Sequence, residues 1–494
     1  MRQTQGRGTL ELADRLRGSP ALAYLITLGV GSALGLVIVG GSLKLVAAAL
    51  GALFVALGVL YPRLIMYVLV ILVVFLSEKA YALQTDDAFR LSGYVLDPVR
   101  LNLYEILVYC LLAILVARRA LAALPREVPT WVTVPCVVVA FLFLFQLGRS
   151  LLAGVPYSEA MYRNNGEYVL AAVAALWCFC ELLGDRAKRL QLLDLLFVCA
   201  TGRAAFALAR YAFGAGDTAN AYERWSVKVA LWESADHLLF VFLIAVAIAA
   251  WGGEKVVGRR LTFWAGGSVL MALTVMLSFR RTGWFGLIAA LVVVTVVLLG
   301  RYGRSLALIP GLLAVVAAIG AWSYTRFASG GSTVERLLPD VFARAGSARQ
   351  DEWALAWRVV ADNPIFGDLM ARRAAAWFAS WPRAVVHNAF LFAWMHFGLG
   401  GLLSLLVLAA VCVAYAVRGV RARGAEEHIA LGAVAVVPFT LFLAMFATPL
   451  IELRTMLILA LVGALAVRVA TTVDEPSEDA VVEGEAGLLG TGIG

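Results

Sequence analysis

A histidine followed by an asparagine opens the last long apolar part of the chain. His387 and Asn388 are followed by nine residues and then by the glycine-rich segment 398–401. Histidine can accept a proton from a hydroxyl group near neutral pH, and titratable groups at a lipid boundary are costly and usually functional. The pair therefore predicts one of two arrangements. His387 is a general base with Asn388 as its cap or orienting residue, or it is a solvated histidine at the start of a capped helix.

Several arginines could hold an anion close to such a base. Arg280 and Arg281 stand side by side in LSFRRTGWFGLIAAL, Arg224 lies in AYERWSVKVALWESADH, and Arg349 lies in SARQDEWALAW. A guanidinium group binds two phosphate oxygens at once and keeps its charge. Plainer interpretations are also open: a pair that snorkels to lipid phosphates for Arg280 and Arg281, a solvated loop residue for Arg224, and an ion pair with a nearby acid for Arg349.

No pattern in the sequence predicts a metal or a cofactor. His387 and His396 are nine residues apart, which places them on opposite sides of a helix. The chain has no HExxH motif, no P-loop and no dinucleotide-binding fingerprint. The six cysteines lie in or at the edges of apolar segments, where they are typical small hydrophobic residues. We therefore expect no cofactor, no metal site and no disulfide framework.

The elements that position these residues must be membrane helices. Of the 494 residues, 62% are hydrophobic and 15% are charged, and the mean hydropathy is +0.86. Apolar blocks of about 17–25 residues suit helices that cross a bilayer, and long strand-like alternation is missing, which argues against a barrel. The sequence predicts an all-α polytopic membrane protein with 12–14 helices. The fourteen apolar segments are 21–40, 43–60, 64–82, 101–117, 131–149, 168–183, 190–213, 237–252, 261–279, 283–300, 305–323, 388–416, 429–447 and 454–470.

Charge in the connecting loops predicts the orientation and the division of the chain. Short basic loops mark the cytoplasmic side, which places both termini there and His387, Arg280, Arg281 and Arg224 together on the other side. The divisions expected are a cytoplasmic segment, a helical bundle, a cap on the outer face, the last helices and an acidic disordered tail. Their bounds are 1–20, 21–323, 324–387, 388–470 and 471–494. The first apolar segment lacks a cleavage site and is predicted to be retained.

The predicted cap at 324–387 is too long to be a simple connector. Trp353, Trp357 and Val360 recur at helical spacing, and Asn363-Pro364 is a stop signal for that helix. Arg349 stands at its start, where Asp351 or Glu352 could pair with it. A second short helix is predicted within 368–380. The cap is thus expected to be partly helical and to end at His387.

Taken together, these motifs resemble the O-antigen ligase and O-antigen polymerase superfamily of bacterial inner-membrane glycosyltransferases. The ligase signature is similar to His387-Asn388, nine residues and Gly398 to Gly401. A Ser-Arg-Gly-type element resembles segment 278–284, with Arg280 in place of the usual serine and Arg281 at the arginine position. An Arg…Trp…Asn-Pro-Leu-Phe-Gly stretch resembles Arg349, Trp353 and 363–367. Recognisable motifs cover roughly 210–410, and Arg224 is placed by its loop alone.

The resemblance implies transfer of a polysaccharide from undecaprenyl pyrophosphate to the lipid A–core, in the inner membrane, at a site that faces the periplasm. It implies His387 as the base that deprotonates the acceptor hydroxyl, with Arg281 and Arg224 at the departing pyrophosphate. Arg280, Arg349 and Asn388 are expected to bind substrate. The transfer would invert the anomeric centre without a metal or a nucleotide. The expected partners are the donor, the acceptor and membrane lipids, and no nucleic acid.

Two other functions stay open. An O-antigen polymerase or a protein O-oligosaccharyltransferase of the same superfamily would share the arginines and the long loop. A secondary transporter would place charges within membrane helices, and Asp194, Arg203 and Arg210 lie inside apolar segments.

Overall fold

The computed structural model describes most of the predicted bundle. The described residues are 57–75, 103–122, 128–157, 160, 167–219, 227–278, 280–302, 352–369, 386–446, 450 and 452–472. Arg224, Arg349 and the side chain of Arg281 lie outside this description, as do both chain ends. So do the predicted segments 21–40 and 305–323, most of 43–60 and nearly all of the second helix expected at 368–380.

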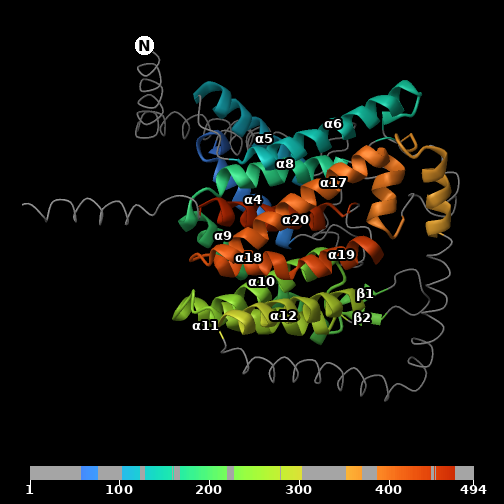
Figure 1. Cartoon of the computed structure of the whole chain (residues 1–494). Helices are drawn as coiled ribbons and strands as arrows, with labels where there is room; N and C mark the ends of the chain where they lie inside the picture. Colours follow the sequence, from blue (N-terminus) through green and yellow to red (C-terminus); the bar gives the residue numbers. More distant parts are fainter. Residues whose placement is uncertain are drawn as a thin grey trace, which may run out of the picture.

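Within those ranges the chain is an all-α polytopic membrane protein (Figure 1). Seven helical stretches there are long and apolar enough to cross a membrane. The helices are α4 (Pro62–Phe75), α5 (Leu103–Ala122), α6 (Thr130–Leu152), α8 (Glu167–Leu182), α9 (Arg186–Ala212), α10 (Ser234–Gly252), α11 (Arg259–Met276), α12 (Arg281–Tyr302), α17 (Ala389–Ala422), α18 (Glu427–Ala435), α19 (Val437–Phe446) and α20 (Leu453–Thr472), with a further helix at 352–362. Each predicted apolar segment that falls on described residues coincides with helix. Segment 429–447 is divided between α18 and α19.

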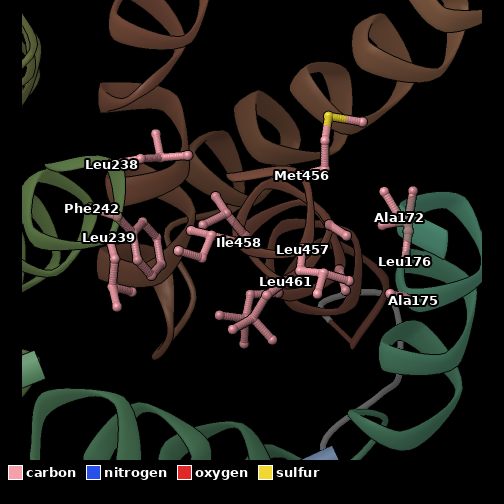
Figure 2. Packing of buried hydrophobic residues seen from close by; sticks show 14 of the residues in the cluster. Ala172, Ala175, Leu176, Leu238, Leu239, Phe242, Met456, Leu457, Ile458 and Leu461 are labelled. Atoms are coloured by element: carbon pink, nitrogen blue, oxygen red, sulfur yellow. The ribbon is translucent and has the colours of Figure 1, made fainter. Parts of the chain in front are cut away.

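The centre of the bundle is α20, with 89% of its spanning window buried, followed by α10 with 83%. Apolar side chains of α20 lie between α8 and α10, as Figure 2 shows. The labelled residues are Ala172, Ala175 and Leu176 of α8, Leu238, Leu239 and Phe242 of α10, and Met456, Leu457, Ile458 and Leu461 of α20. These helices form the rigid frame against which the remaining helices pack.

Ion pairs gather at the two ends of the bundle. We call the end that carries His387 the His387 end; the other is the opposite end. Pairs between different helices at the opposite end are Arg119–Glu181, Arg189–Glu426, Arg260–Asp194 and Arg301–Glu427. The pairs at the His387 end include those that join α9, α10 and α20, and they are described below. The middle of the bundle is filled almost entirely by apolar side chains, as the hydrocarbon region requires.

A short β-pair between α9 and α10 is an element that the sequence pattern did not reveal. Strands β1 (Asp217–Ala219) and β2 (Val227–Val229) are antiparallel, and Asp217 pairs in register with Val229. With three residues each, the strands are too short for a recognisable alternation. Just after β2, the Ala230 N–H donates to the Leu277 carbonyl at 3.1 Å, which fixes the pair to the end of α11. The β-pair lies at the His387 end (Figure 1).

Candidate functional site

His387 is held by a carboxylate from the helix at 352–362. Its Nδ1 lies 3.0 Å from Glu352 Oε2 and 3.1 Å from Oε1, and its backbone N–H donates to Glu352 Oε1. The Glu352 side chain is 12% exposed, whereas that of His387 is 37% exposed. With Nδ1 directed at the carboxylate, Nε2 is the nitrogen that can take up a proton. An acid in this position can orient a histidine so that its other ring nitrogen acts as a base.

Asn388 begins α17 directly after this histidine. Its side-chain oxygen accepts a hydrogen bond from the Leu391 N–H at 3.0 Å, and its backbone is extended, as is typical of an N-cap residue. The predicted capping role is confirmed, while its predicted contact with substrate stays a prediction. The cap fixes where the helix begins and thus where the neighbouring imidazole stands.

The helix at 352–362 follows the pattern predicted from the sequence. Val360 is buried, Trp353 is partly buried against the core, and the helix ends before Asn363-Pro364. Trp357 lies edge-on to Trp394 of α17, with ring centroids 5.4 Å apart. These contacts hold the helix against α17 and thereby hold Glu352 beside His387.

Backbone hydrogen bonds join the loop at 363–368 to a break in α17. Gly398 has a φ of +69°, so the helix that was predicted to continue through 398–401 is interrupted there. The Leu399 N–H donates to the carbonyls of Pro364 and Ile365, at 3.2 and 3.1 Å, and the Asp368 N–H donates to Met395 O at 2.8 Å. A Cβ on Gly398 would lie 2.2 Å from the Ile365 oxygen. Only glycine allows both the backbone conformation and this approach.

Helix α6 also contacts this loop. Gln146 and Arg149 both donate to the Phe366 carbonyl, the latter at 2.8 Å, and the Arg149 guanidinium lies 5.3 Å from the centre of the Phe366 ring. The Phe366 carbonyl therefore gains two side-chain donors outside regular secondary structure. The two glycine-containing motifs that the sequence shows separately, 363–367 and 398–401, are thus one structural unit.

An aromatic chain links this unit to the start of α12. The Trp353 ring is 6.4 Å from Phe446, Phe446 is 4.8 Å from Phe442, and Phe442 stacks at 4.3 Å on Phe285. Phe285 lies one turn after Arg281, where α12 begins. The chain of contacts puts the first turn of α12 and the Glu352–His387 pair at the same end of the bundle.

Residues 266–406 match the family model described as O-antigen ligase. The match contains both arginines at the start of α12, Glu352, the docked loop and the histidine with its glycine motif. This match supports a relationship of the segment to the O-antigen ligase superfamily. No curated protein matches the chain. The match begins within α11 and ends within α17, so this segment is called the ligase domain below.

The match to the ligase domain supports a glycosyltransferase-like enzyme of the O-antigen ligase or polymerase type. This family implies glycan and lipid substrates in the membrane. Glu352 is the residue of this domain that sequence reasoning did not recognise as a partner of His387. It is 35 residues away along the chain, and the sequence offered Arg349 as its only evident partner. A single acid at the start of a helix carries no periodic signal.

Arg280, predicted to bind substrate, is engaged by the protein itself. Its guanidinium donates to the Trp232 carbonyl and lies 5.1 Å from the centre of the Trp232 ring. Burial lowers the pKa of this guanidinium, and the carboxylates of Glu452 and Glu233 oppose that shift. Arg280 thus ties the ligase domain to the loop before α10, and substrate binding by it stays a prediction.

The transporter alternative rested on Asp194, Arg203 and Arg210, and each of these residues has an ion-pair partner. Arg203 bonds Asp236 at 3.3 Å, Arg210 bonds Asp217 at 3.1 Å, and Asp194 accepts from Arg260 at 2.8 Å. A partner supplied by the fold accounts for each of these residues.

Arg454 is the centre of a buried network beyond the ligase domain. It is 1% exposed, and it bonds Glu233 and, at 2.9 Å, Asp236. It also donates to the carbonyls of Val73 and Val74, at 2.7 and 3.2 Å. The network ties α4, α10 and α20 together at the His387 end and supplies a fixed frame for the site.

Proposed function

We propose that this protein is an O-antigen ligase that transfers a polysaccharide from undecaprenyl pyrophosphate to a sugar hydroxyl of the lipid A–core. The observation that carries the proposal is the Glu352–His387 pair at the start of α17. It is a base with one nitrogen oriented by an acid and the other side of its ring partly exposed. The reaction would take place in the bacterial inner membrane, on the periplasmic side.

In this mechanism the acceptor hydroxyl gives its proton to His387 Nε2. The acceptor oxygen bonds to the anomeric carbon of the donor sugar while the bond from that carbon to the pyrophosphate oxygen breaks. The electron pair leaves with the pyrophosphate, and a single displacement inverts the anomeric centre. The Glu352 carboxylate holds the ring and stabilises the imidazolium that forms. A base of this kind contributes about 10²–10⁴-fold to the rate.

The departing pyrophosphate requires positive charge close to the reaction centre. Arg281 is the strongest candidate, because it begins α12 one turn before Phe285, at the end of the aromatic chain from Trp353. Arg224 is proposed as a second clamp residue and Arg349 as a substrate-binding residue, both from the family resemblance. Arg280 is a weaker candidate, since Trp232 already holds its guanidinium.

Reconstitution with purified components tests the proposal. Wild-type protein in detergent, with a lipid-pyrophosphate-linked glycan and lipid A–core, should form capped lipopolysaccharide. The His387→Ala variant should lose about 10²–10⁴-fold in rate while eluting as a folded protein. Transfer by His387→Ala at the parental rate would show that His387 is not the base.

The same assay separates the ligase from its relatives. A polymerase would lengthen the lipid-linked glycan in place of transferring it to the core, and an oligosaccharyltransferase would require a protein acceptor. In a deletion strain, loss of a ligase leaves bare core and accumulated lipid-linked polymer. Loss of a polymerase leaves core that carries a single repeat.

A further inference from the structure

His237 is a buried histidine near the start of α10, only 2% exposed. Its Nδ1 lies 2.7 Å from the Glu233 carbonyl oxygen. Because a carbonyl only accepts, Nδ1 carries the hydrogen, and Nε2 of the neutral ring carries the lone pair. No donor in the described part of the chain bonds to Nε2. A buried acceptor without a donor costs stability, so an apolar side chain would suit this position better if it only filled space.

The imidazole of His237 rests against the first turn of α12. Helices α10 and α12 lie side by side (Figure 1), and Gly283 belongs to the first turn of α12. A Cβ on Gly283 would lie 2.6 Å from His237 Cδ2 and 3.2 Å from Nε2, so only glycine leaves room for the ring. The lone pair of Nε2 thus faces the helix end that carries a partial positive charge. The contact is both steric and electrostatic.

The other side of the imidazole is tied to the rigid frame of the bundle. Glu233, whose carbonyl accepts from His237 Nδ1, also bonds Arg454 through its carboxylate. Arg454 in turn donates to two backbone carbonyls at the end of α4, at 2.7 and 3.2 Å. The ring therefore cannot move away from α12 without disturbing this network.

Arg281 lies between two contacts with the segment that leads into α10. Directly before it, Arg280 donates to the Trp232 carbonyl, and two residues after it, Gly283 meets the ring of His237. The backbone of Arg281 is therefore fixed on both sides by one short segment of the chain.

We propose that His237 is a positioning residue for the transfer reaction, an inference that rests on the proposed function. By holding the first turn of α12, it fixes the place from which Arg281 can reach the departing pyrophosphate. A charge stabilises a leaving group best when it is in place before the bond breaks, and a displacement of about 1 Å can cost about 10²-fold in rate. His237 thus acts through Arg281, without touching the substrate itself.

His237→Phe keeps a ring in this position but removes both nitrogens. The bond to the Glu233 carbonyl and the lone pair that faces α12 are lost, so we expect kcat to fall about 10–10²-fold in the reconstituted transfer assay. The KM for lipid A–core and the yield of monodisperse protein should stay as in the wild type, because an apolar ring suits a buried position. A wild-type kcat in this variant would show that the ring only fills space and would overturn the inference.

A double-mutant cycle tests whether His237 acts through Arg281. Arg281→Ala alone should lower kcat, and adding His237→Phe should cause no further loss, because the charge to be positioned is gone. Losses that multiply would mean that the two residues act independently, and the positioning role would be wrong while the proposed function stands. If wild-type protein transfers no glycan, the proposed function fails and this inference fails with it.

Gly283 allows a second cycle on the same contact. Gly283→Ala should push the ring and the helix apart and lower kcat by a similar factor. In the His237→Ala background the new methyl group meets no ring, so Gly283→Ala should cost nothing more. Gly300→Ala in the same helix is the matched control, because a Cβ there meets no described atom within 4 Å. If Gly283→Ala were as harmless as Gly300→Ala, the contact would not position α12, and the inference would be overturned.

Discussion

Two acid–base clusters at the His387 end use similar residues in different ways. In the Arg454 cluster the guanidinium is 1% exposed, and two carboxylates and two backbone carbonyls accept its hydrogen bonds. In the Glu352–His387 pair the acid is largely buried, while the histidine is 37% exposed. The first cluster is closed on itself and joins helices. The second leaves one side of an imidazole accessible, which is what proton transfer to a substrate requires.

The comparison shows how a charge in a membrane protein can be classified from geometry. A buried ionised group without partners is very costly, so a closed network indicates a structural role. A group that is oriented on one side and accessible on the other indicates a chemical role. The following variants test whether the two clusters separate in this way.

The largest effect is expected when the closed cluster is broken. Arg454→Ala leaves Glu233 and Asp236 buried without their common partner, so we expect a loss of about 3–5 kcal/mol of stability. The amount of monodisperse protein extracted from membranes should fall sharply.

Arg260→Ala is the matched control, because its pair with Asp194 is about 40% exposed; surface pairs contribute about 0–1 kcal/mol. Equal losses in the two variants would contradict the structural role assigned to Arg454.

The second largest effect is expected for the Glu352–His387 pair. Glu352→Gln removes the negative charge at Nδ1 but keeps the shape of the side chain, so about 100-fold in kcat should be lost, within the range expected for a base. KM and extraction yield should stay near those of the wild type. The split between kcat and KM is measured in the reconstituted transfer assay.

Glu352→Asp should restore part of the rate, because the charge returns at a slightly shorter reach. Asp362→Asn, an exposed acid at the end of the same helix, should leave kcat unchanged. If Glu352→Gln lowered the yield as much as Arg454→Ala, the pair would be structural and the distinction drawn above would be wrong.

Backbone hydrogen bonds between the two glycine motifs keep Glu352 next to His387. Gly398→Ala places a Cβ against the Ile365 carbonyl in a backbone conformation with positive φ, which should cost about 1–3 kcal/mol. A melting experiment in detergent should show a lower midpoint, and transfer should fall because Glu352 shifts relative to His387.

In Gly400→Ala the new methyl group would meet only side-chain atoms of Leu142, at 3.8 Å or more. This variant should behave as wild type. Equal effects of the two alanines would mean that the docked loop at 363–368 does not hold the site together.

Part of this site could be predicted from the sequence, and part of it could not. Helical spacing and stop signals are local, so the helix at 352–362 and the capped start of α17 follow from the printed residues. The Glu352–His387 contact and the docking at Gly398 join segments about 30 residues apart, and a glycine-rich motif in an apolar run reads as simple close packing.

Asp217 of β1 is intermediate between the Arg454 cluster and the Glu352–His387 pair, and it also lies at the His387 end of the bundle. It accepts from Arg210 at 3.1 Å and from the Trp232 N–H at 3.0 Å. Burial raises its pKa from 3.8 to about 7, and the charge of Arg210 opposes that shift. The folded protein therefore binds a proton here at pH values where the unfolded chain does not. This contribution to stability is fully present below about pH 4 and is lost as the pH rises to about 7.

Asp217→Asn should flatten this pH dependence, because the amide does not titrate and still accepts from the Trp232 N–H. We expect the melting midpoint of the wild type to fall by about 1–2 °C per pH unit more than that of the variant between pH 4 and 7. Asp362→Asn should keep the wild-type slope. Coincident slopes for wild type and Asp217→Asn would mean that Asp217 is ionised throughout, and it would then belong with the closed Arg454 cluster.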